Sequence, residues 1–99
     1  AGYVSFGRNR TRHLPFTGEI FELYVAPAHQ GLGFGRRLFN VARRKLLAHG
    51  HSSTLVWALA DNEPAIGFYS ALGGVVIGEA RENFGDRSLD RRAFGFVGA

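Results

Sequence analysis

The sequence predicts an α/β domain built on a mixed, twisted sheet whose central strands are parallel and whose faces carry helices. The main observation is a strand over 19–25, a glycine-rich turn and a basic helix over 34–48, followed by a second strand over 54–60. A strand, a helix and a strand of these lengths imply a right-handed crossover that pairs the two strands in parallel. A second helical pattern and two further apolar segments add elements to this centre.

Aromatic and β-branched residues over 3–6 predict a first strand of about five residues, which a glycine ends. The connection 8–18 is polar and arginine-rich, which is typical of a solvated loop. The strand 19–25 is almost wholly apolar, with Glu19 and Glu22 as its only charges. Two acids in such a segment require an explanation.

The glycines Gly31, Gly33 and Gly35 stand at alternate positions between this strand and the basic helix. Their missing Cβ atoms leave the backbone amides approachable. Two arginines in the first turn of the helix oppose the positive end of the helix dipole, unless an anion binds there. Open amides at a helix N-terminus form such an anion site, so residues 30–37 are predicted to hold phosphate. A flexible turn followed by a solvated basic face is the alternative interpretation.

The segment 54–60 is short, apolar and partly β-branched, which predicts a buried strand. Asn62 and the aspartate before it can cap a second helix, in which Pro64 occupies the tolerated first turn. Apolar residues then recur at helical spacing until two consecutive glycines stop the helix. The segments 75–77 and 92–97 predict a β-hairpin whose strands are joined by a long polar loop.

Two motifs decide between phosphate-binding families. The dinucleotide pattern G-x-G-x-x-G fails because Arg36 stands where its third glycine should be, and no Walker lysine follows the glycines. Residues 30–35, QGLGFG, resemble the Q/R-x-x-G-x-G/A signature of the GNAT superfamily of N-acetyltransferases. Residues 62–73, NEPAIGFYSALG, resemble the second signature of the same family, N-x-x-A-x-x-F/L-Y-x-x-x-G, in the expected order along the chain.

The resemblance implies a GNAT-like acyl-CoA N-acyltransferase fold that binds acetyl-CoA, as co-substrate, in a wedge between the two central parallel strands. A typical member begins with a strand, one or two helices and a further strand before the position of Tyr3, so the resemblance predicts an N-terminally incomplete domain. It also implies that the strand, the glycine turn and the second helix contact the cofactor. The residues carried over are Leu23, Tyr24, Val25, Gln30, Gly31, Leu32, Gly33, Phe34, Gly35, Arg36, Asn62, Ala65, Phe68 and Tyr69.

The reaction implied by the resemblance is direct acetyl transfer to a primary amine in a ternary complex, with Tyr69 as general acid beside the CoA sulfur. An ammonium with a pKa of about 10 must lose a proton before it attacks. The position of Glu19 matches a strand glutamate that acts as base in histone-type members, and Glu22 is the second choice. In another group of the family the base is a glutamate on the next strand, and Trp57 occupies that position here. A structural tyrosine and a water chain in place of either glutamate are the alternatives.

Composition limits the remaining possibilities. Ninety-nine residues predict one domain, with a core motif over 19–48, a second motif over 54–74 and a C-terminal hairpin over 75–97. The net charge of +4 favours anionic partners. The sequence has no cysteine and no apolar run long enough to cross a membrane, which fits a cytoplasmic protein without thiolate metal sites. The opening AGYVSFG lacks Met, which predicts a piece of something longer.

Three functions therefore remain, in order of preference. The first is an N-acetyltransferase that uses acetyl-CoA, without a metal, to modify a small molecule or a protein. The second is a CoA-binding module without catalysis. The third and least favoured is a small basic nucleic-acid binder, suggested by Arg8, Arg10 and Arg12 and by the basic helix. The terminal strand 92–97 is free to pair with a second copy of the chain, which allows a homodimer.

Overall fold

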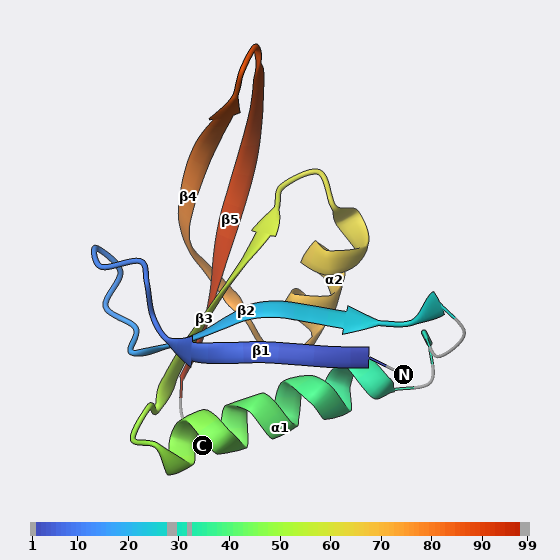
Figure 1. Ribbon diagram of the computed structural model, residues 1–99, viewed down its shortest axis with the longest axis vertical. Coiled ribbons are helices and arrows are strands. Elements are labelled where there is room, and N and C mark those ends of the chain that lie inside the picture. The colour runs from blue at the N-terminus through green and yellow to red at the C-terminus, as the bar shows by residue number, and fades with distance from the viewer. Residues whose placement is uncertain (1, 28–29, 32, 98–99) are drawn as a thin grey trace.

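The computed structural model describes residues 2–27, 30, 31 and 33–97. Within these residues the chain forms a five-stranded sheet and two helices, so the mixed α/β class is confirmed (Figure 1). No helix in this described part is long and apolar enough to span a membrane. The elements are β1 (Gly2–Arg8), β2 (Gly18–Val25), α1 (Phe34–Ala48), β3 (Ser53–Leu59), α2 (Glu63–Ala71), β4 (Val75–Phe84) and β5 (Arg87–Val97).

The strand order is β1-β2-β3-β5-β4, and only the central pair β2 and β3 is parallel. This pairing confirms the predicted crossover through α1. It extends over just three residue pairs, from Gly18 opposite Thr54 to Ile20 opposite Val56. Beyond Ile20 the two strands diverge, as Figure 1 shows. Over its second half, the backbone of β2 therefore has no neighbouring strand of the described residues on that side.

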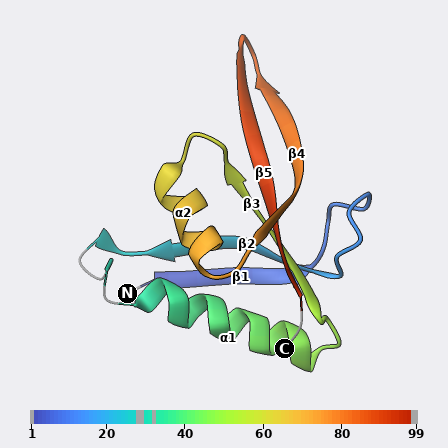
Figure 2. The same ribbon diagram turned by 180° about the vertical axis from the view of Figure 1, so that it is seen from behind.

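Both helices contribute to one core cluster on the same face of the sheet. Phe39 of α1 is almost fully buried, and its ring lies 4.8 Å from that of Phe96 on β5 and 6.3 Å from that of Tyr69 on α2. The view from behind shows α1 along β1 and β2, with α2 higher, beside β3 (Figure 2). The apolar periodicity of the two helices is thus explained by one shared core.

The opposite face of the sheet is partly covered by the connection between β1 and β2. Asn9 organises this loop, because its side-chain amide donates to the carbonyls of Thr11, Leu14 and Phe16. The Phe16 ring lies directly over Gly95 of β5, where a Cβ would stand only 2.5 Å from it. The segment that the sequence suggested to be a solvated loop is therefore held against the sheet.

The prediction of a long polar loop within the C-terminal hairpin was wrong. Strand β4 continues to Phe84 and β5 begins at Arg87, so only Gly85 and the residue after it form the turn. Oppositely charged residues face each other across the strands, with Arg81 Nε 2.8 Å from Asp90 Oδ1. This end of the hairpin extends away from the core, so its strands carry polar residues and resemble a loop in sequence (Figure 1).

The end of α2 explains why two glycines follow it. Gly73 adopts a left-handed φ of 95°, which ends the helix. At Gly74 a Cβ would stand 2.6 Å from the Phe96 ring and 2.9 Å from the carbonyl oxygen of Tyr69. The space that a side chain would need here is already filled by Phe96.

We expect Gly74→Ala to destabilise the fold by about 1–3 kcal/mol, because the buried Phe96 ring has no room to move away. Gly67→Ala is the matched control, since a Cβ at Gly67 meets nothing within 4 Å beyond its own helix. The control should stabilise α2 by roughly 0.5–1 kcal/mol. Urea unfolding followed by circular dichroism measures both, and equal stability of the two variants would contradict the packing argument.

Candidate functional site

A groove of about 590 Å³ opens where β2 leaves β3. The second half of β2, the glycine turn and the N-terminal part of α2 line it. Two smaller hollows, of about 370 and 190 Å³, lie on the distal hairpin and beside the second half of α1. The groove-lining residues are Leu23, Val25, Gln30, Gly31, Gly33, Gly35, Arg36, Asn62, Pro64, Ala65, Phe68 and Tyr69.

The N-terminus of α1 opens onto this groove without a side-chain cap. The N-cap residue is Gly33, with a left-handed φ of 81°, and the first turn contains no acidic residue. The amide of Arg37 is the first to donate to the carbonyl four residues earlier, at 3.1 Å from Gly33 O. The amides before it lack such a partner within the helix, so the positive end of the dipole faces the groove together with Arg36.

The glycines of the turn have different roles. Gly31 and Gly33 both adopt positive φ, and a Cβ at either would meet nothing within 4 Å. Glycine is therefore required at these positions by the backbone conformation and not by lack of space. Gly35 allows contact instead, since a Cβ there would stand 3.2 Å from the Phe68 ring. The side chain of Gln30 closes the turn by donating to the carbonyl of Val25 at 3.0 Å. The turn is therefore fixed by backbone conformation and by close packing of α1 against α2.

Helix α2 supplies the other wall of the groove. Asn62 is its N-cap, and the side-chain oxygen accepts a bond from the amide of Ala65 at 3.3 Å. Tyr69 is only 8% exposed, and its ring contacts those of Phe39 and Phe94. Burial raises the pKa of the Tyr69 phenol above its ordinary value. Tyr69 thus contributes a neutral phenol to the lining of the groove, and no hydrogen bond joins this phenol to the described part of the chain.

Eleven of the fourteen predicted cofactor residues thus lie together in the groove, and two other described ones do not. The side chain of Tyr24 is exposed and does not line it, and neither does Phe34, whose ring lies 5.5 Å from the guanidinium of Arg37. Leu32 lies outside the described residues. Pro64 lines the groove and was not predicted, although its place beside the Asn62 cap could have suggested it.

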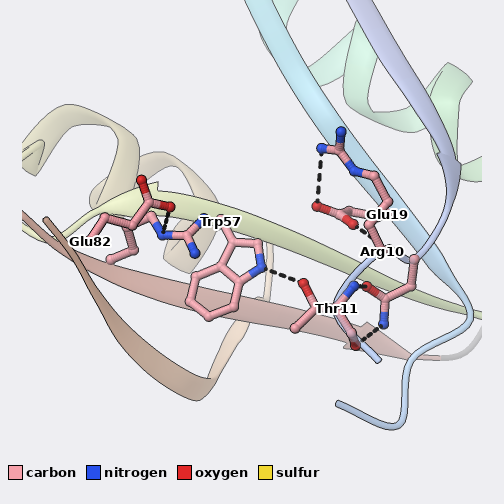
Figure 3. Close-up of polar contacts among 7 residues, drawn as sticks. Arg10, Thr11, Glu19, Trp57 and Glu82 are labelled. Carbon is pink, nitrogen blue, oxygen red and sulfur yellow. Dashed lines mark hydrogen bonds and ion pairs between the residues drawn. The ribbon is translucent and has the colours of Figure 1, made fainter. Parts of the chain in front are cut away.

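The two candidate bases lie outside the groove. The Glu19 side chain is 5% exposed, and its Oε1 accepts a bond from the backbone amide of Arg10 at 2.9 Å (Figure 3). Its Oε2 is 3.8 Å from a guanidinium nitrogen of the same arginine. Glu22 is exposed and accepts a bond from the Tyr3 hydroxyl at 3.4 Å. Trp57, at the alternative base position, donates from its indole to the Thr11 hydroxyl at 3.0 Å.

A β-bulge places both glutamates on the face away from the helices. Opposite β1, Glu22 pairs with Ser5 and Ile20 pairs with Phe6, so Phe21 is an extra residue in β2. Ile20 and Leu23 both pack toward the helical core, although they are three residues apart. Regular alternation would have put the two carboxylates on opposite faces. No group of three acidic or histidine side chains in the described residues is arranged to hold a metal ion.

Comparison with known proteins defines the family. A model of the Acetyltransferase (GNAT) family matches residues 1–74, and the chain therefore belongs to the GNAT family. It is 39% identical over 70 residues to the uncharacterized N-acetyltransferase YuaI of Bacillus subtilis strain 168. The matched region covers 71% of this chain and 40% of YuaI. It is 40% identical over 73 residues to the mycothiol acetyltransferase of Acidothermus cellulolyticus, covering 74% of this chain and 22% of that enzyme.

Solved structures agree with this assignment. The YncA protein of Salmonella typhimurium, solved with its cofactor acetyl-CoA, matches with a TM-score of 0.78 and 28% identity over 97% of this chain and 57% of YncA. A GNAT-family protein from Desulfovibrio desulfuricans matches the fold with a TM-score of 0.82 at 19% identity, over 98% of this chain and 60% of that one. The chain thus spans less than two thirds of the relatives described here.

The buried phenol predicts a pH-dependent stability. Because the pKa of Tyr69 is raised in the folded state, the folded chain keeps a proton that the unfolded chain releases above about pH 10. The stabilisation is present below that pH and is lost as the pH rises through the folded pKa. We expect Tyr69→Phe to lose less stability than the wild type between pH 9 and 11, as measured by urea unfolding.

Tyr24→Phe is the control, because it removes a hydroxyl from an exposed ring. Its stability should follow the wild-type curve over the same range. Identical curves for all three proteins would mean that Tyr69 does not hold its proton more tightly when the chain is folded.

Proposed function

We propose that this chain binds acetyl-CoA in the groove and transfers the acetyl group to a primary amine by direct attack in a ternary complex. The observation that carries the proposal is the uncapped N-terminus of α1, which opens onto the groove beside the half of β2 that does not pair with β3. A pyrophosphate binds to free amides at a helix N-terminus, and an extended chain with amide groups binds to the open side of a strand. The similarity to YncA, whose structure contains acetyl-CoA, supports the same donor.

In this proposal the phosphates lie on the amides after Gly33, and Arg36 adds a cation beside them. The pantetheine arm pairs with the backbone of β2 from Leu23 to Val25, and Asn62 faces it from the cap of α2. The acetyl carbonyl then lies near the divergence of the strands. Backbone amides of β2 are available there to stabilise the oxyanion that forms during the attack.

Two side chains complete the chemistry. Tyr69 is neutral and lines the groove, so we assign it as the general acid that protonates the leaving thiolate. Glu19 remains the first choice as base, because it stands one residue before the last pair of β2 with β3, and its Oε2 contacts Arg10 only as an ion pair, at 3.8 Å. A water molecule would carry the proton of the amine to it. Glu22, which is exposed and farther along β2, remains the second choice.

A CoA-binding module without catalysis is the second candidate. The observation in its favour is that neither candidate base, Glu19 or Glu22, lines the groove. The two candidates share the donor site and differ in the kinetic experiment below.

Donor binding is tested by calorimetric titration of the chain with acetyl-CoA. We expect Arg36→Gln to weaken binding by about 3- to 10-fold, because one charged partner of the phosphates is lost. Arg44→Gln is the matched control, since it removes the same charge from the same helix outside the groove. Equal weakening by both substitutions would indicate general attraction by net charge and would contradict a phosphate site at the α1 N-terminus.

Catalysis is tested with steady-state acetyl transfer to a panel of primary amines. Tyr69→Phe and Glu19→Gln should each lower kcat by about 100-fold while leaving acetyl-CoA binding within about 2-fold. Glu19→Gln keeps an acceptor oxygen for the Arg10 amide, so the fold is preserved. If the wild type binds acetyl-CoA but transfers to no amine, and neither substitution changes the affinity for acetyl-CoA, the non-catalytic module is the correct description.

A further inference from the structure

The face of the sheet away from the helices carries an exposed aromatic pair beside a carboxylate. The rings of Tyr3 on β1 and Tyr24 on β2 lie 5.6 Å apart with an angle of 32° between their planes, and they are 52% and 47% exposed. The carboxylate of Glu22 lies against this pair, bonded to the Tyr3 hydroxyl. Two aromatic faces and one negative charge are the groups that recognise an organic cation.

The β-bulge at Phe21 creates this arrangement. Leu23 packs toward the helical core, so its neighbours Glu22 and Tyr24 both face the other way. The hydroxyl of Ser5, opposite Glu22 in the ladder, is buried and has no hydrogen-bond partner among the described residues. Because this hydroxyl is buried, it takes no part in the site, and the groups that this face exposes are the Tyr3 and Tyr24 rings and the Glu22 carboxylate.

The same face already holds one cation of the chain itself. The guanidinium of Arg10 lies 3.9 Å from the centre of the Phe21 ring and 3.8 Å from the Glu19 carboxylate. An aromatic ring and a carboxylate of β2 therefore bind a cationic group a few residues before the exposed pair. Tyr3, Glu22 and Tyr24 repeat this chemistry, and no cation of the described residues is paired with them.

We propose that Tyr3, Glu22 and Tyr24 form a binding site for an ammonium or guanidinium group of the acceptor. The role of this site in acetyl transfer rests on the proposed function. The site then defines the substrate class as an acceptor with at least two cationic groups. Leu23 and Val25 line the donor groove from the opposite side of the same strand. One cationic group is held by the aromatic pair while the reacting amine reaches the donor through the gap between β2 and β3.

The site is tested without acetyl-CoA, by titrating the isotopically labelled chain with spermidine and, separately, with a short end-blocked peptide that contains two lysines. Amide chemical shifts of β1 and β2 report binding. Tyr24→Leu should lower the affinity for the cationic probe by about two- to fivefold, as expected for loss of one exposed cation–π contact. Glu22→Gln should weaken it at least as much and should reduce the salt dependence.

Matched controls stand on the distal hairpin. Phe84→Leu removes another exposed aromatic ring and Asp86→Asn removes another exposed carboxylate, and both should leave the affinity unchanged. Stronger binding of spermidine would indicate a polyamine acceptor, and stronger binding of the peptide would indicate a lysine-containing chain. Failure of both probes to bind, or equal losses in the control variants, would overturn the proposal.

The donor titration is read separately on the same variants. Acetyl-CoA binding that is retained while the cation affinity falls supports the cation site, and in a transfer assay the loss should appear in KM of the acceptor with kcat little changed. If the wild type does not bind acetyl-CoA, the proposed function is refuted, and the cation titration stays valid as a test of the site.

Discussion

The early separation of β2 from β3 is the constraint on which the rest of the structure depends. Three residue pairs hold the parallel centre together, and after Ile20 the backbone of β2 has no described strand beside it on the side of β3. The space that results is bounded by the glycine turn and by α2, which is held close to α1 because Gly35 has no side chain. A fully paired central strand would leave no groove, whatever the motifs on either side of it.

The bulge in β2 adds a second consequence to this separation. One extra residue, Phe21, turns the following part of the strand so that Leu23 and Val25 face the helices and the groove. The residues between and before them face the other side of the sheet. A single strand thus presents apolar side chains toward the proposed donor and acidic and aromatic side chains toward the proposed acceptor, and the gap beside it joins the two faces.

Local features of this chain could be predicted from the sequence because their causes are local. The glycine turn, the helix 34–48 and the Asn62 cap depend on neighbours within a few residues, and the structure has all three. The extent of the hairpin could not be predicted, because its polar residues are paired across strands by ion pairs such as that of Arg81. The shared face of the glutamates depends on a bulge, which periodicity alone does not specify.

The position of β5 between β3 and β4 determines when the core can close. This strand follows every other described element along the chain, and it carries Phe94 and Phe96, which fill the core against Phe39 and Tyr69. While the chain is being synthesised, the apolar faces of both helices emerge from the ribosome before the strand that covers them. The nascent chain is therefore exposed to aggregation until β5 inserts, and folding must wait for nearly the whole described sequence.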